Sequence, residues 1–244
     1  AVGLLLAEAG DDADVLVISD HGFGACRYQI NPNMWLRDHG YLHLYRAHKL
    51  RARQICWTAR DGGRVPLPRI EVGPPRRRIA WRRTRAFGSL YTLSHGIWLN
   101  MQGRDIQGVV APGREAERLA QELADGLLTL TLPDGMPVFR AVERAEEYYP
   151  GAYATAIGDL VPLPFDPSVR LMGQFTTGSA IEDLASQPSG RGNHRPEGIL
   201  LARGPHICAC QAPDDTGIVD VTPSTLALLG EPVPEYMDGR ALFA

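Results

Sequence analysis

The 244-residue sequence lacks the features that mark several specialised classes of protein. No apolar stretch approaches the roughly 20 residues that a membrane-spanning helix requires. Four cysteines are too few for a disulfide scaffold in a chain of this length. The formal net charge is only −3, so the chain as a whole carries no signature of polyanion binding. A hydrophobic content of 44% indicates instead a globular protein with a sizeable core.

The start of the sequence has neither a Met nor the basic region of a signal peptide. Residues 1–10 predict the last turns of an amphipathic helix that ends at Gly10. Because a domain rarely begins inside a helix, we expect the chain to be a fragment that lacks sequence upstream. The low cysteine count favours a cytoplasmic location, although an export signal would lie in the upstream part.

Two candidate metal ligands follow an apolar run near the start of the chain. Residues 15–18 (Val-Leu-Val-Ile) predict a buried strand, and Asp20 and His21 come directly after it. In open α/β sheets the reactive groups lie at the carboxyl ends of strands. A carboxylate oxygen and an imidazole nitrogen both suit a divalent metal ion. The alternative is that Asp20 only caps a turn.

A third candidate ligand lies in a glycine-rich loop near the other end of the chain. Residues 190–198 (Gly-Arg-Gly-Asn-His-Arg-Pro-Glu-Gly) lead into residues 198–202, which predict another buried strand. We interpret His194 as a ligand on this tight loop, and the alternative is an ordinary surface histidine.

Three further histidines and the Cys-x-Cys pair receive structural interpretations. The histidines at positions 39, 43 and 48 show no ligand spacing and are expected at the surface or partly packed. Cys208 and Cys210 lie two apart on an expected strand with no obvious further ligand, so we interpret them as buried thiols.

The pattern of apolar residues predicts an α/β layered fold. Strands are expected at residues 41–45, 97–101, 138–142 and 160–163, and helices at residues 34–40, 114–130 and 224–230. Residues 46–85 differ from the rest, because they hold 13 of the 25 Lys and Arg residues and only two acidic ones. We interpret residues 41–95 as an inserted, loop-rich, cap-like segment. It could attract an anionic substrate, contact nucleic acid, or be a solvated surface that pairs with acidic residues elsewhere.

The ordered motifs resemble the C-terminal portion of the type I phosphodiesterase/nucleotide pyrophosphatase family, within the alkaline phosphatase superfamily. The resemblance rests on residues 19–23, 81–86, 99–104, 146–151, 192–198 and 218–226. It implies that residues 1–244 form part of one alkaline-phosphatase-like domain. That domain would have a layered sheet with helices on both faces, incomplete at the N-terminus.

The resemblance also implies the chemistry. Family members hydrolyse phosphoric esters through a covalent Thr or Ser phospho-enzyme and hold two divalent ions, usually zinc, with manganese as a further possibility. Asp20 and His21 would bind the ion that activates the nucleophile, and His194 would bind the other ion. The substrate would be a small phosphorylated or nucleotide-like molecule rather than a nucleic acid, and the oligomeric state is not predicted.

The chain departs from the family pattern in what it lacks. The family's nucleophile, its first metal-binding Asp and its Asp-x-x-x-His pair all lie upstream of the Ser-Asp-His-Gly block, so no catalytic residue is expected in this chain. Three hydroxyl residues that follow that block are not interpreted as the nucleophile: Thr176, Thr177 and Ser179. We therefore expect these residues alone to bind metal weakly, to turn over no substrate and to leave apolar strand edges exposed.

Two groups of alternatives stay open at this point. One is another chemistry of the same superfamily: a phosphomonoesterase, a sulfatase-like hydrolase or a phosphoglycerate mutase. The other is a non-catalytic protein that binds an anionic partner through its basic segment.

Overall fold

The chain divides into two units, which are described separately. Unit 1 consists of Ala1–Gly24 and His194–Ala244, and unit 2 is Ala25–Asn193. The computed structural model describes residues 2–45, 79–89, 96–151, 156–173, 179–185 and 192–243, together with the backbone of residues 56–58 and 64–66.

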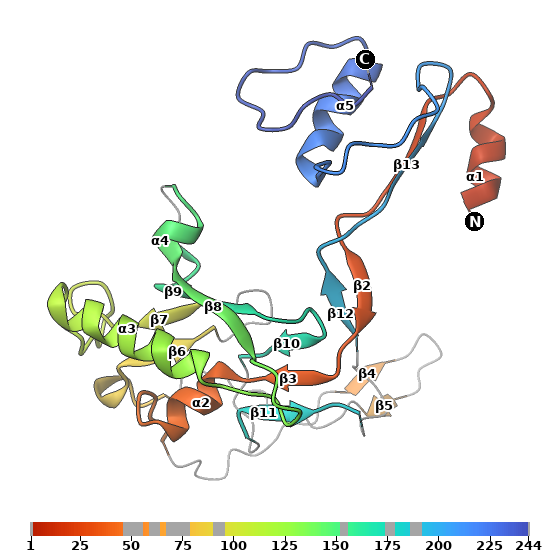
Figure 1. The fold of residues 1–244 in the computed structure, drawn as a ribbon. Helices are drawn as coiled ribbons and strands as arrows, with labels where there is room; N and C mark the ends of the chain where they lie inside the picture. The colour runs from red at the N-terminus through yellow and green to blue at the C-terminus, as the bar shows by residue number, and fades with distance from the viewer. Residues whose placement is uncertain are drawn as a thin grey trace. The chain divides into compact units, whose positions relative to one another are not determined.

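A four-stranded antiparallel sheet forms the centre of unit 2 (Figure 1). Its strands lie in the order β6 (Ala86–Gly88), β7 (Ile97–Leu99), β9 (Leu160–Pro164) and β8 (Phe139–Arg144). The strands predicted at residues 97–101, 138–142 and 160–163 are thereby confirmed. β9 is a central strand in spite of its prolines, because it pairs with β7 only at Leu160, before Pro162 is reached.

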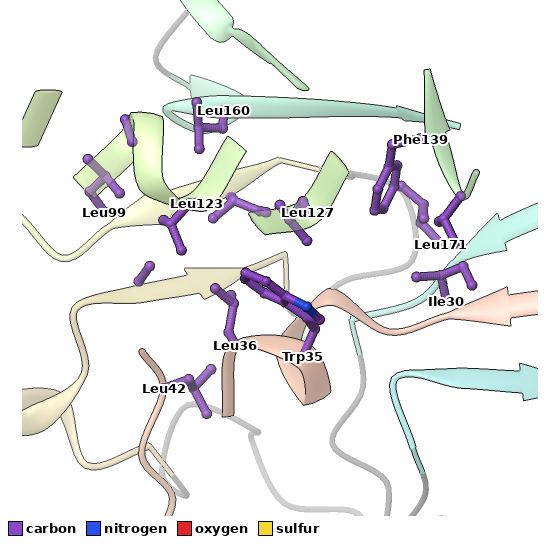
Figure 2. Close-up of a cluster of buried hydrophobic side chains, with 14 of the residues drawn as sticks. Ile30, Trp35, Leu36, Leu42, Leu99, Leu123, Leu127, Phe139, Leu160 and Leu171 are labelled. Atoms are coloured by element: carbon purple, nitrogen blue, oxygen red, sulfur yellow. The ribbon is translucent and has the colours of Figure 1, made fainter. Parts of the chain in front are cut away.

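Two helices pack on this sheet through the faces that the sequence predicts. α3 (Arg114–Leu128) contacts β8 and β9, and its fully buried residues include Leu119, Leu123 and Leu127. α2 (Pro32–Asp38) contacts β6 and begins after Asn31, whose side chain accepts a hydrogen bond from the Met34 N–H at 3.3 Å. Figure 2 shows side chains from both helices meeting in one apolar cluster.

A second sheet of unit 2 has three strands. β3 (Tyr28–Ile30) lies between β10 (Val169–Leu171), which is parallel to it, and β11 (Ile181–Asp183), which is antiparallel. A separate strand pair, β4 (Cys56–Thr58) and β5 (Arg64–Pro66), falls in the expected inserted segment. Most of that segment, residues 41–95, lies outside the described residues, so its cap-like character stays a prediction.

Unit 1 is built on a two-stranded antiparallel ribbon (Figure 1). β1 (Val15–Ile18) pairs with β13 (Leu200–Arg203), with Val15 opposite Arg203 and Ile18 opposite Leu200. α1 (Val2–Ala9) precedes the ribbon, while η4 (Ile218–Asp220) and α5 (Val221–Leu228) follow it. β2 (Gly22–Ala25) pairs with β12 (Gly192–Arg195), and the chain passes between the two units within these strands.

The structure corrects the prediction that both strands of the ribbon are buried. The side chains of β1 are half-buried or exposed, Ile18 is 44% exposed and Leu201 of β13 is 64% exposed. In the described part of the chain each of these strands pairs with the other alone, and side chains of both strands remain exposed on the ribbon.

Two smaller predictions are wrong, and one helix begins earlier than predicted. Residues 41–45 form no strand, and only Leu44 makes an isolated bridge, with Ile79. Cys208 and Cys210 are exposed in a loop rather than buried on a strand. The helix expected at residues 224–230 begins at Val221, because a proline is tolerated in the first helical turn, where its missing N–H needs no partner.

The observed fold is mixed α/β. The sheets in the described part of the chain have between two and four strands, and the large layered sheet with helices on both faces stays a prediction. None of the helices among the described residues is long and apolar enough to cross a membrane.

Candidate metal centre

The turn that carries Asp20 and His21 is tied to the segment before β13 by two hydrogen bonds. The Ser19 N–H donates to the Ile199 carbonyl at 3.1 Å, and the Ile199 N–H donates to Ser19 Oγ at 2.9 Å. These bonds extend the β1–β13 pairing by one residue just before the candidate ligands. The hydrogen bonds to Ile199 therefore hold the first residue of the turn, Ser19, in place, although the two residues are remote in sequence.

Two glycines allow these segments to approach each other closely. A Cβ atom at Gly22 would lie 2.2 Å from the Glu197 carbonyl oxygen, and one at Gly198 would lie 2.6 Å from the Ser19 carbonyl oxygen. Both clashes are with backbone, which cannot move aside as a flexible side chain can. Gly22 of the first motif and Gly198 of the second are thus both required for the contact between the two segments.

This contact brings His194 against His21. The two imidazole rings stack with their centroids 3.9 Å apart and their planes 25° apart. The Phe23 ring lies tilted beside His194, at 5.9 Å between centroids. The two motifs identified in the sequence therefore meet in the structure, within unit 1.

The hydrogen bond of His21 sets which ring nitrogen is free to bind a metal. Its Nδ1 lies 2.8 Å from the Gly22 carbonyl oxygen, which can only accept, so Nδ1 carries the proton. In the neutral ring Nε2 then has a free lone pair, the arrangement usual for a metal-ligating histidine. Nε2 lies 3.5 Å from Asp20 Oδ1.

The donor atoms of Asp20 and His21 fit one ion. Zn–N and Zn–O bonds of about 2.0–2.2 Å at tetrahedral angles separate two ligand atoms by roughly 3.3–3.5 Å. The observed Nε2–Oδ1 distance of 3.5 Å agrees with this separation. The Asp20 side chain is 77% exposed and that of His21 is 37% exposed, so an ion could reach both from solvent.

The site is nevertheless partial. The described residues contain no group of three or more His, Cys, Asp or Glu side chains gathered to hold one ion. Asp20 and His21 supply two of the four ligands of a tetrahedral ion, and the stacked His194 ring lies beside them rather than completing that set.

Comparison with known proteins assigns the chain to a family. The sequence model described as Type I phosphodiesterase / nucleotide pyrophosphatase matches residues 1–195. The chain belongs to this family. The matched range includes Asp20, His21 and His194, and membership suggests phosphoester hydrolysis with a small nucleotide or phosphoester substrate. No curated protein and no solved structure matches the chain significantly.

Other side chains considered from the sequence belong to unit 2 of this phosphodiesterase-family chain. His39 stacks on Trp35 with centroids 4.2 Å apart, and its Nδ1 lies 2.9 Å from the Trp35 carbonyl oxygen. Ser179 donates its hydroxyl to the Ile181 carbonyl. His43 is half-buried, whereas His48, Thr176 and Thr177 lie outside the described residues.

Two features of the structure were missed in the sequence. Ser19 binds Ile199 and so holds the turn that carries Asp20 and His21. Its position directly before Asp20 was the signal that could have indicated this role. The His206 side chain contacts the carboxylate of Asp14, 2.8 Å from Nδ1 to Oδ2, which no local pattern indicates because the two residues are far apart in sequence.

Proposed function

We propose that the chain carries part of the catalytic metal centre of a phosphodiesterase or pyrophosphatase. Asp20 and His21 would bind one divalent ion and His194 a second one, with zinc the first candidate and manganese the alternative. The observation that supports this proposal is the stacking of His194 on His21 beside the carboxylate of Asp20, at 3.9 Å and 3.5 Å respectively.

The spacing of the two rings supports separate ions for the two histidines. The lone pair of an imidazole nitrogen lies in the plane of its ring. Two stacked rings therefore direct their lone pairs side by side, in two planes that lie one above the other. The centroid distance of 3.9 Å is close to the separation of about 3.5–4 Å between the ions of two-metal hydrolases. A single ion bound by both rings would require them to be turned toward each other, edge to edge.

Each residue of the site has a distinct part in this proposal. The Gly22 carbonyl holds the Nδ1 proton of His21 and so keeps Nε2 available. Ser19 fixes the start of the turn against Ile199. Two bound ions supply charge stabilisation for the attacking and leaving oxygens of an in-line displacement at phosphorus.

The remaining parts of the machinery follow from family membership. A Thr or Ser nucleophile would form a covalent phospho-enzyme, and further ligands would complete both ions. These groups would come from a part of the protein outside residues 1–244 and would complete an alkaline-phosphatase-like layered sheet. By itself the chain would then turn over no substrate.

The test is hydrolysis of bis(p-nitrophenyl) phosphate by the complete protein. Asp20→Ala and His194→Ala should each reduce kcat/KM by about 100-fold or more, because each removes a ligand from an ion that stabilises the transition state. His39→Gln is the matched control, since His39 stacks on Trp35 within unit 2, belongs to neither ligand motif and should keep parental activity. A chelator should abolish turnover, and added zinc or manganese should restore it.

Substrate choice separates this proposal from its alternatives. Faster turnover of p-nitrophenyl phosphate or p-nitrophenyl sulfate than of the diester would indicate a phosphomonoesterase or a sulfatase-like enzyme instead. Near-parental activity in either ligand variant would count against the metal centre itself.

A further inference from the structure

A histidine and two cysteines occupy alternate positions in the loop that follows β13. The sequence His206-Ile-Cys-Ala-Cys210 places one imidazole and two thiols within five residues. Both thiols, those of Cys208 and Cys210, are free and exposed, and the His206 side chain is 71% exposed. All three belong to unit 1, and none of them belongs to the motif that carries Asp20 and His194.

Asp14 holds His206 by two contacts. One carboxylate oxygen, Oδ1, accepts the backbone N–H of His206 at 3.1 Å, and the other, Oδ2, lies 2.8 Å from Nδ1. An ionised carboxylate can only accept, and Nδ1 therefore carries the proton.

With the Nδ1 proton held by Asp14, Nε2 is the ring nitrogen that remains available to a metal ion. A histidine that donates its other ring N–H to a carboxylate is the usual outer-shell pattern around protein-bound zinc. The carboxylate fixes both the tautomer and the direction of the ring. Asp14 and His206 thus show this pattern independently of the cysteines.

The two thiols supply the remaining donors. Thiolate ligands select soft or borderline ions such as zinc, and a Cys₂His set with water in the fourth position is an established zinc coordination. Residues 8–14 and 204–217 contain six acidic residues, of which Asp11 pairs with Arg203 and Asp215 pairs with Arg240. The acidic residues are Glu8, Asp11, Asp12, Asp14, Asp214 and Asp215.

We propose that His206, Cys208 and Cys210 bind a zinc-class divalent cation, with Asp14 as the positioning residue and a water molecule as fourth ligand. In the described part of the chain the three donors are not yet gathered around one point. The side chains of Cys208 and Cys210 turn toward Nε2 when the ion binds, and both thiols release their protons to solvent. This site is separate from the proposed phosphoesterase centre, so either can fail without the other.

The experiment is an anaerobic titration of the protein with Co²⁺, followed by competition with Zn²⁺. Cobalt bound to thiolate gives a sulfur-to-metal charge-transfer absorption that oxygen and nitrogen ligands do not give. The expected result is one equivalent of cobalt with this absorption and its loss when zinc is added. Asp20→Ala with His194→Ala should keep the band, as should Cys26→Ala with Cys56→Ala.

Three variants decide the outcome. Cys208→Ser with Cys210→Ser should remove the band, and His206→Gln and Asp14→Asn should each weaken cobalt binding by about 10–100-fold. A far-UV circular dichroism spectrum like that of the parent checks that each variant is folded, and His206→Gln alters only an exposed side chain. The proposal is overturned if the parent shows no thiolate band. It is also overturned if the band survives the double serine variant, or if His206→Gln binds cobalt as tightly as the parent.

Discussion

The imidazole of His21 lies stacked on the imidazole of His194, with 3.9 Å between the ring centroids. The first ring follows β1 and the second belongs to β12, so the contact depends on long-range pairing within unit 1. Three features hold the segments together: the Ser19–Ile199 hydrogen bonds and the close approaches at Gly22 and Gly198. A change to any of them should therefore affect the candidate metal centre without altering a ligand.

Replacing Gly22 by Ala should disturb this centre. The new Cβ atom would lie 2.2 Å from the Glu197 carbonyl oxygen, so the two segments must separate. Overpacking of this kind costs about 1–3 kcal/mol of unfolding free energy. In the complete protein we expect a lower kcat/KM for the diester together with a lower midpoint of urea unfolding.

Gly3→Ala is the matched control for this prediction. A Cβ atom at Gly3 meets nothing within 4 Å, and Gly3 lies inside α1, where alanine favours the helix. Unchanged activity and unfolding in Gly22→Ala, as in Gly3→Ala, would mean that the two segments do not touch in solution.

The apolar face of α3 should account for much of the stability of unit 2. Leu123 is fully buried in the main cluster, so Leu123→Ala should reduce the unfolding free energy by about 2–5 kcal/mol. Leu128 lies on the same helix but is exposed, and Leu128→Ala should change the unfolding free energy by less than about 1 kcal/mol. Denaturant unfolding followed by circular dichroism measures both values, and equal losses would contradict the packing described for α3.

Asn33 should be a sensitive polar residue of unit 2. It is fully buried, its Nδ2 donates to the Gly173 carbonyl at 2.8 Å, and its Oδ1 accepts the Gly88 N–H at 2.7 Å. Asn33→Ala leaves these buried backbone groups without partners, at about 1–3 kcal/mol for each group. The control is Gln121→Ala, which removes a single exposed hydrogen bond to Asp125. Similar unfolding midpoints for the two variants would show that the Asn33 network is not formed.

The elements predicted correctly are those whose signal is local. The 3.6-residue repeat of leucines gave α3, and short apolar runs gave β7, β8 and β9, because periodicity and strand propensity act within a few residues. Burial was predicted less well. Residues 15–18 do form a strand, but an apolar run does not show what packs on the faces of the strand, and Ile18 of β1 is exposed.

The candidate site was likewise predicted only in part from the sequence. The Ser-Asp-His-Gly and Gly-Asn-His-Arg motifs identified the histidines that meet, because ligand residue types and glycines are visible in the sequence. The stacking of the rings and the Ser19–Ile199 bonds were not predicted, since they depend on the register between strands remote in sequence. The exposed Cys208 and Cys210 were misassigned for a related reason: alternate spacing suggested a strand, and the structure has a loop there.

The last prediction concerns pH and the C-terminal part of unit 1. The buried carboxylate of Asp220 accepts the Gly217 N–H at 2.9 Å and the Arg240 N–H at 2.8 Å. These two backbone hydrogen bonds, that of Gly217 first, lower the pKa of Asp220 below its ordinary value of 3.8. The folded state therefore binds this proton less readily than the unfolded state.

The sign of the effect follows from that difference. The stabilisation by Asp220 is fully present above the unfolded pKa and is lost as the pH falls through the lower pKa of the folded state. Asp220→Asn should lower the melting temperature at pH 7, because an amide cannot accept from both N–H groups as the carboxylate does, and the decrease should shrink as the pH approaches 3. The measurement is the melting temperature of parent and variant between pH 7 and pH 3, with the exposed Asp214→Asn as control. A gap between Asp220→Asn and the parent that stayed constant over this range would show that the charge of Asp220 does not stabilise the fold.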